Sequence, residues 1–175
     1  VSEATKNYMV EHENVRKGKI SVIRLAYDFK LYPRVDDEFV RQLRESIGAN
    51  LVLITIGQFI PIKRPDVSIR VLKRIVENGI DAKLILLGRG EMDLMCRKLA
   101  FDLEIEERVI FAGHVSNVLD YISVSTVLLH PSISESSCVA VKEAGFLKCP
   151  VVVSKGVGDF DSYLVHGMNA FLVDS

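Results

Sequence analysis

Short runs of β-branched and other apolar residues alternate along the chain with longer segments in which apolar positions recur every three or four residues. The short runs predict strands, and because they are apolar almost throughout, they are typical of parallel strands buried on both faces. The longer segments predict helices between the strands. This alternation indicates strand–helix–strand units, so we expect an α/β fold with a parallel sheet and helices on both faces.

The clearest predicted helix follows Pro65, because proline suits the first helical position and Gly79 can close the far end. Other helices are expected at residues 37–47, 91–103, 117–123, 138–147 and 159–165. Strands are expected at residues 20–26, 51–57, 83–88, 109–113, 127–130, 150–154 and 170–173. The first fifty residues differ in character, with a polar stretch of helical potential at residues 2–17, one strand and a loop.

Composition narrows the function classes. The 175 residues are 49% hydrophobic and 26% charged with a formal net charge of −1, which excludes intrinsic disorder. Without a clustered basic excess, neither nucleic acid nor an anionic membrane surface is an expected partner, and an anionic ligand must be held locally. Cys96, Cys138 and Cys149 form no CxxC pair, which argues against a disulfide framework or a structural zinc site and favours a reducing, cytoplasmic compartment.

Candidate chemistry lies directly after the predicted strands, where open parallel sheets bind ligands. Glycine, serine and single cations recur there, at residues 57–63, 88–91, 113–116, 131–137 and 155–159. Backbone amides and helix N-termini in such positions can hold an anion. In the most specific segment Glu135 follows a strand and Glu143 lies eight positions later. If a helix begins near Ser136 or Ser137, both carboxylates can face one crevice; the alternative is two solvated surface charges.

The order of these segments resembles the C-terminal, donor-binding half of the retaining glycosyltransferases of family 4, which have the GT-B fold of two Rossmann-like domains. The resemblance covers residues 51–174 in five motifs: GQFIPIK, LILLGRGE, VIFAGHV, PSISESSCVAVKEAG and PVVVSKGVG. Upstream, KISVIRLAYDF is similar to the family's crossing between domains. The resemblance implies a nucleotide-sugar donor-binding, Rossmann-like domain at residues 51–175 and an interdomain crossing segment of polar helix, strand and loop at residues 1–50.

By this resemblance Lys63 matches the basic residue on the donor diphosphate, Glu143 the acceptor of hydrogen bonds from the ribose hydroxyls, and Glu135 the glutamate near the transferred sugar. Catalysis would then rest on positioning and on charge stabilisation of the leaving diphosphate, with Lys63 and Glu135 as the expected catalytic residues.

The resemblance also implies donor-binding roles for the residues after the first glutamate, whose amides would meet sugar hydroxyls and phosphate: Ser136, Ser137, Cys138 and Val139. Gln58 joins the donor-binding set at a position where the family usually has arginine. The diphosphate would thereby lose one of two cations unless Arg64 or Lys155 replaces it.

The expected function is therefore transfer of a hexose from a UDP-, GDP- or ADP-sugar to an acceptor hydroxyl, with retention, in polysaccharide, lipopolysaccharide or glycolipid synthesis. No metal and no other cofactor is expected. The expected partners are the nucleotide-sugar donor and an N-terminal acceptor-binding domain, and the longer enzyme could associate peripherally with a membrane. Without the acceptor domain, we expect the chain to bind donor with little or no transfer.

Several alternatives remain open from the residues. The fold could serve a non-catalytic nucleotide-binding or regulatory module, or Glu135 and Glu143 could be the carboxylate pair of a glycoside hydrolase. Asp159 and Asp161 form a DxD string, for which a turn with a helix-capping aspartate is favoured over a metal site. An NAD site is disfavoured because Asp93 replaces the third glycine of the fingerprint. His130 is expected to be a buried, hydrogen-bonded ring, since the histidines show no paired metal-ligand spacing.

Overall fold

The strands form one sheet that is parallel throughout. A computed structural model describes residues 2–23 and 26–174, and within them six strands pair in the order β3-β2-β1-β4-β5-β6. The strands are β1 (Leu51–Ile56), β2 (Ala82–Leu87), β3 (Val109–Gly113), β4 (Val127–His130), β5 (Val151–Ser154) and β6 (Phe171–Val173). In this order, that of a doubly wound sheet, the winding reverses between β1 and β4. The predicted α/β fold with a parallel sheet is confirmed.

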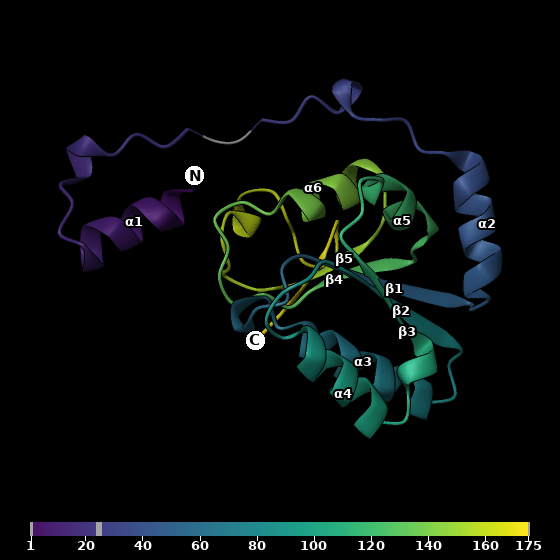
Figure 1. The fold of residues 1–175 in the computed structure, drawn as a ribbon. Helices are drawn as coiled ribbons and strands as arrows, with labels where there is room; N and C mark the ends of the chain where they lie inside the picture. The colour runs from purple at the N-terminus through teal and green to yellow at the C-terminus, as the bar shows by residue number, and fades with distance from the viewer. Residues whose placement is uncertain (1, 24–25, 175) are drawn as a thin grey trace.

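Helices cover both faces of the sheet, as Figure 1 shows. They are α1 (Glu3–His12), α2 (Asp37–Ile47), α3 (Pro65–Glu77), α4 (Asp93–Asp102), α5 (Val118–Val124) and α6 (Val139–Phe146). Short 3-10 turns are η1 (Lys17–Lys19), η2 (Phe29–Leu31), η3 (Pro61–Lys63), η4 (Glu106–Arg108) and η5 (Phe160–Ser162). Helices α3 and α4 pack on one face, whereas α5 and α6 pack on the other and α2 packs against α5. No helix of the described residues is both long and apolar enough to cross a bilayer.

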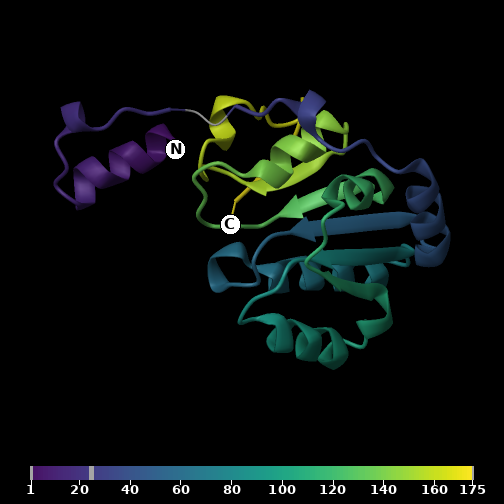
Figure 2. The ribbon, with the colours of Figure 1, turned by 45° about the horizontal axis from the view of Figure 1, so that its top comes forward.

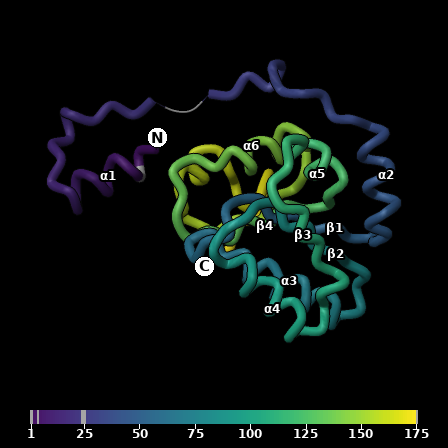
Figure 3. The backbone as a smooth tube through the Cα atoms, viewed as in Figure 1, coloured from purple at the N-terminus to yellow at the C-terminus, as the bar shows by residue number. Residues whose placement is uncertain are grey.

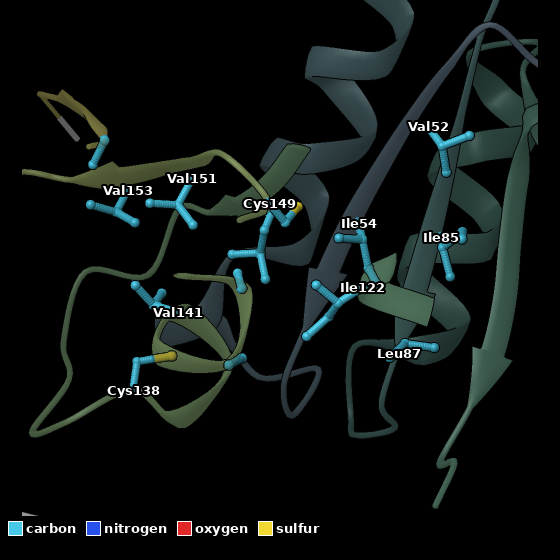
Figure 4. Close-up of a cluster of buried hydrophobic side chains, with 14 of the residues drawn as sticks. Val52, Ile54, Ile85, Leu87, Ile122, Cys138, Val141, Cys149, Val151 and Val153 are labelled. Carbon is cyan, nitrogen blue, oxygen red and sulfur yellow. The ribbon is translucent and has the colours of Figure 1, made fainter. Parts of the chain in front are cut away.

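The core is divided into two layers by the sheet. Val52 and Ile54 of β1 point into the layer under α5 and α6, together with Ile85 of β2 (Figure 4). The intervening Leu53 and Leu84 point into the layer under α3 and α4. Because successive side chains of a strand alternate between faces, an almost continuous apolar run supplies both layers at once.

Before α2, the residues from 26 onward run past α6, as Figure 3 shows. The ring of Phe29 stacks on Phe146 of α6 with 4.5 Å between the ring centroids. The predicted strand at residues 20–26 is wrong for the residues of that range that the structure describes, 20–23 and 26; residues 24 and 25 lie outside the described residues. Its β-branched residues fit a strand pattern, but Ile23 is 79% exposed and the run does not join the sheet.

The predicted helix at residues 159–165 is also wrong, since only the single turn η5 forms there. Tyr163 leaves the helical conformation at φ −146°, and the chain then turns so that Leu164 is buried in the core. The periodicity of this segment reflects two buried anchors, Phe160 and Leu164, on a winding loop.

Candidate functional site

The loops that follow β1 and β4 lie side by side at the carboxyl edge of the sheet, toward which the arrowheads of the central strands point in Figure 2. The amide of Ile133 donates to the carbonyl of Ile62 at 3.0 Å, and the Ser132 hydroxyl donates to the same carbonyl at 3.2 Å. Since β1 and β4 flank the point where the winding reverses, these loops border the crevice in which open α/β sheets bind ligands.

Lys63 reaches this crevice from the end of η3. Its amide donates to the carbonyl of Ile60 at 3.0 Å, Arg64 then takes a left-handed conformation with φ 52°, and Pro65 begins α3. The ammonium group of Lys63 forms an ion pair with Oε1 of Glu135 in the loop after β4. The structure thus brings the two predicted catalytic residues into direct contact.

Two further side chains extend this pair into a group that we call the His130 cluster, made of Lys63, His130, Glu135 and Cys138. Nε2 of His130 lies 2.6 Å from Oε1 of Glu135, and Nδ1 of the same ring lies 3.9 Å from Sγ of Cys138. His130 is 3% exposed at the end of β4, as expected of a buried, hydrogen-bonded ring. The cluster therefore links the β1 loop, β4 and the start of α6.

The charges of the cluster stabilise one another. Burial alone would lower the pKa of His130, but hydrogen bonds and electrostatic interactions with Cys138 and Glu135 outweigh it and raise the pKa to about 9. Burial would raise the pKa of Glu135, but His130 and Lys63 outweigh that effect and lower it. Glu135 is therefore ionised between two cationic groups at neutral pH.

A cleft of about 380 Å³ opens beside Glu135. Its walls are the loops after β4 and β5 and two residues of α1: Ile133, Ser134, Glu135, Ser136, Gly156, Val157, Gly158, Thr5 and Tyr8. Gly158 has φ +61°, and a Cβ there would stand 2.9 Å from Cβ of Glu135. Glycine is required at this position because the β5 loop closes directly on the Glu135 backbone and side chain.

The helix after Glu135 begins later than the sequence suggests. We expected a start near Ser136 or Ser137, whereas α6 begins at Val139 with Cys138 as its N-cap. Ser137 accepts a hydrogen bond from the Lys142 ammonium and does not cap the helix. The side chain of Val139 is exposed, and the first amides of α6 lack partners within the helix, as in every α-helix, so they remain available to an anion.

Glu143 consequently does not share the cleft of Glu135, contrary to the expectation of one crevice for both carboxylates. It lies more than one turn into α6 and is hydrogen bonded to Tyr32 of the segment before α2. Burial raises the pKa of Glu143, and the Tyr32 hydrogen bond offsets part of that rise. Tyr32 therefore interacts with the Glu143 carboxylate, the group that the resemblance implies accepts hydrogen bonds from the ribose.

Gln58 lies on the other side of the β1 loop. It is exposed and lines a second cleft, of about 420 Å³, at the ends of β1, β2 and β3, together with Arg89 and His114. Sequence reasoning placed Arg89 after a strand but gave it no role, although the GRG string was the available signal. Arg89 lines the same cleft as Gln58 and carries the positive charge that Gln58 lacks. It is therefore a third candidate to replace the family's arginine, beside Arg64 and Lys155.

The glycines of the GRG string serve close packing of backbones. A Cβ on Gly88 would stand 1.8 Å from the carbonyl oxygen of Gly57, and one on Gly90 would stand 2.4 Å from that of Phe59. The amide of Phe59 donates to the carbonyl of Arg89 at 3.0 Å. These glycines hold the loops after β1 and β2 together, which explains them without an NAD site.

The two aspartates of the DxD string, Asp159 and Asp161, lie at the start of η5. The expected turn is present, with Asp159 in the N-cap position of η5, but the Asp159 side chain accepts a hydrogen bond from Lys142 at 2.9 Å and makes no capping hydrogen bond, so the capping role is wrong. Asp161 is exposed on η5. In the part of the chain that the structure describes, the acidic, histidine and cysteine side chains that approach metal-binding distance are instead His130, Glu135 and Cys138.

The fold matches solved glycosyltransferase structures. The crystal structure of Anabaena Alr3699/HepE in complex with UDP-glucose has a TM-score of 0.88 and 24% sequence identity, covering 99% of this chain and 48% of that one. At this identity the likeness establishes the fold alone, which is that of the C-terminal domain of GT-B glycosyltransferases.

Two curated relatives of this chain are a synthase and a glycosyltransferase, and the chain matches a similar share of each. The N-acetyl-alpha-D-glucosaminyl L-malate synthase of Bacillus anthracis is 29% identical over 167 residues, which are 93% of this chain and 42% of that protein. The UDP-Gal:alpha-D-GlcNAc-diphosphoundecaprenol alpha-1,3-galactosyltransferase of Escherichia coli is 26% identical over 172 residues, which are 91% of this chain and 44% of that protein. The chain thus spans less than half the length of these relatives.

The sequence profile of the glycosyl transferases group 1 matches residues 36–175, which include the β1 loop with Lys63 and the β4 loop with Glu135. The match covers most of the chain and agrees with the predicted motifs and the observed fold. The chain therefore belongs to the glycosyl transferases group 1 family.

Proposed function

We propose that this chain is the donor-binding part of a retaining glycosyltransferase, which holds a nucleoside-diphosphate sugar and transfers its hexose to an acceptor hydroxyl in polysaccharide, lipopolysaccharide or glycolipid synthesis. The observation that carries the proposal is the meeting of Lys63 and Glu135 across the β1/β4 switch point. Family membership supplies the reaction class.

The diphosphate binds between Lys63 and the first turn of α6. Lys63 offers a compact positive charge, and the amides at the start of α6 offer hydrogen bonds and the positive end of a helix dipole. These groups stabilise the charge that develops on the diphosphate as the glycosidic bond breaks. The side chain of Lys63 is 25% exposed, so water screens this charge only partly.

The sugar lies in the cleft beside Glu135, where Ser136 and the Gly158 backbone line the walls. Glu143 binds the ribose, because its carboxylate can accept hydrogen bonds from a diol. A carboxylate has room for about four hydrogen bonds, so the ribose can add to the Tyr32 hydrogen bond or replace it. The base then lies toward the second cleft, near His114.

Two features support a transferase over the other interpretations. The relatives named above are transferases or synthases, and one is named for a UDP-sugar donor. The glycoside hydrolase alternative needs two carboxylates facing one bond, whereas Glu143 is hydrogen bonded to Tyr32 outside the Glu135 cleft. The proposal also places the boundary between the crossing segment and the donor-binding domain at residue 50. In it, the acceptor is bound by a part of the enzyme outside residues 51–175.

A titration of the chain with UDP, GDP and ADP, each free and sugar-linked, tests donor binding. Lys63→Ala should weaken binding of the preferred nucleotide by roughly 10- to 100-fold, as expected for loss of a charged hydrogen bond. Lys73→Ala is a matched control, because Lys73 is 27% exposed on the neighbouring helix and also pairs with a glutamate. Absence of binding by every nucleotide, or equal losses in both variants, would contradict the assignment.

The same titration, run with a chromogenic glycoside and no nucleotide, separates the enzyme classes. Glycosidase activity lost in Glu135→Gln would support a hydrolase. Tight nucleotide binding that is indifferent to the attached sugar would support a regulatory module. The proposal predicts tighter binding of one nucleotide sugar than of its sugar-free nucleotide, and little transfer by the chain alone.

A further inference from the structure

We propose that His130, Glu135 and Cys138 form a binding site for Zn²⁺. The three side chains converge from β4, the β4 loop and the N-cap of α6, and one potential ligand atom from each lies within 4.8 Å of the others. Neither the family nor the proposed donor chemistry assigns a metal here, and the sequence spacing did not predict one. The metal-binding part of the inference does not depend on the proposed function.

The donor set selects the metal. A thiolate sulfur, an imidazole nitrogen and a carboxylate oxygen suit a borderline-soft ion such as Zn²⁺, whereas Mg²⁺ and Ca²⁺ prefer oxygen alone. Tetrahedral zinc with bonds of about 2.0–2.3 Å holds its ligand atoms roughly 3.3–3.8 Å apart. A single ion takes only one nitrogen of the imidazole. If that nitrogen is Nδ1, its 3.9 Å separation from Cys138 Sγ is close to this range. Glu135, whose Oε1 lies 2.6 Å from the other nitrogen, Nε2, must then turn its carboxylate toward the ion.

The surroundings favour a bound cation. Zn²⁺ together with a thiolate, a carboxylate and a neutral imidazole as ligands carries no net charge, and burial tolerates such a complex better than separate charges. His130 is 3% exposed and Cys138 8%, and the rings of His130 and Phe160 pack in a T-shaped arrangement with 5.8 Å between their centroids. Of the three proposed ligands, Glu135 also lines the cleft beside the β4 loop and so connects the site to solvent.

The loop that carries Glu135 is already ordered for this role. The Ser132 hydroxyl donates to the carbonyls of Ser134 and Ile62, which fixes the turn between His130 and Glu135. Both hydrogen bonds that Glu135 makes to the described side chains end on Oε1, so Oε2 is the oxygen that can turn to the metal as the carboxylate leaves Lys63. Lys63 occupies the carboxylate when the metal is absent, and the ammonium competes with Zn²⁺ for it.

Metal titration of the tag-free chain tests the site directly, with Zn²⁺ measured by competition against a chromogenic chelator and Co²⁺ followed by absorption. We expect one ion per chain and, with Co²⁺, the near-ultraviolet band that a cobalt–thiolate bond produces. Cys138→Ser should lower affinity on the order of 100-fold and abolish the band. This variant should fold, because serine is a favoured N-cap residue.

Two control variants make the outcome decisive. Cys96→Ser changes a buried thiol far from the cluster and should leave metal binding unchanged. Lys63→Met removes the competing ammonium and should tighten Zn²⁺ binding roughly tenfold. Absence of stoichiometric binding, a cobalt spectrum without the thiolate band, or equal losses in Cys96→Ser and Cys138→Ser would overturn the proposal.

A competition experiment connects the metal to the donor site, and this step rests on the proposed function. Because Zn²⁺ would take Glu135 from Lys63, saturation with Zn²⁺ should weaken binding of the preferred UDP-, GDP- or ADP-sugar in wild type but not in Cys138→Ser. A chain that binds Zn²⁺ through Cys138 but binds no nucleotide would contradict the proposed function and leave the metal site established.

Discussion

At the scale of single residues, Glu135 organises the site. It is held between the Lys63 ammonium and the His130 ring, and its side chain is 8% exposed. An ionised carboxylate this buried is stable only when it is paired with positive charge. Removal of Lys63 or His130 would therefore leave negative charge on Glu135 that the surroundings do not fully compensate. Lys63 and His130 therefore fix the position of Glu135 before any ligand arrives.

Gly158→Ala should damage both stability and donor binding. The new Cβ would meet Cβ of Glu135 at 2.9 Å and its carbonyl oxygen at 3.1 Å, and alanine disfavours φ +61°. The expected loss in free energy of unfolding is about 1–3 kcal/mol, measured by urea denaturation, with weaker nucleotide-sugar binding.

Gly167→Ala separates the two causes of that loss. Gly167 has φ +76°, but a Cβ there meets no atom within 4 Å and it lies outside the Glu135 cleft. The Gly167→Ala variant should lose about 1 kcal/mol of free energy of unfolding, because alanine disfavours this positive φ, and it should keep the nucleotide affinity of the wild type. Equal affinity losses in both variants would contradict the role of Gly158 in placing Glu135.

Sequence reasoning could identify Lys63 and Glu135 because each follows a predicted strand, and the ends of parallel strands meet at one edge. It could not place Cys138 against His130, because that contact depends on the path of the loop between them. The same limit explains Glu143, whose partner Tyr32 is more than a hundred residues away along the chain.

At the scale of elements, most of the helices and strands follow from hydrophobic period and end signals. The prediction for α2 is confirmed to the residue, and β3 and β4 have their predicted bounds. The start of α6 was misplaced because serine is a common N-cap, yet here Ser137 is hydrogen bonded to Lys142 and Cys138 takes the N-cap position. Local preference could not anticipate a tertiary hydrogen bond.

The C-terminal ends of α3 and α4 offer a stability test. Both helices end with paired hydrogen bonds of the Schellman type, at Gly79 and Glu104 respectively, and both residues have positive φ. Glu104→Gly should raise the free energy of unfolding by about 0.5–1 kcal/mol, because glycine adopts this conformation without steric cost.

Gly79→Ala is the reciprocal change and should lower the free energy of unfolding by about 1 kcal/mol, since no atom lies within 4 Å of the new Cβ and only φ is at issue. Urea unfolding of the two variants measures both effects. Destabilisation by Glu104→Gly would contradict the assigned left-handed termini.

At the scale of the whole molecule, the strand order places ligand chemistry at one edge. The apolar runs predicted a parallel sheet, and the motif order suggested the domain, but the strand order itself required the structure. It puts the β1 and β4 loops next to each other although about seventy residues separate Lys63 from Glu135. The near-neutral charge of the chain agrees with a site that binds an anion through one cation and helix amides.

The molecule also contains a larger cavity, of about 700 Å³, away from this edge. It lies between the C-terminal end of α6, the loop before β6 and Phe29 of the crossing segment. Its walls are mainly apolar, and Lys142 and Lys148 supply its cationic groups among the described residues. By size alone, this cavity would be the expected ligand site. The reversal of strand order between β1 and β4 instead favours the crevice between Lys63 and Glu135 as the ligand site.

Amide chemical-shift mapping of the chain by NMR, with UDP-glucose as the first ligand and GDP- and ADP-glucose after it, compares the two places directly. We predict that the largest shifts fall at residues 58–64, 131–139 and 156–159, around the β1/β4 switch point, and that they become smaller in Lys63→Ala at the same ligand concentration. Shifts confined to residues 145–151 and 163–171, around the larger cavity, would contradict the account.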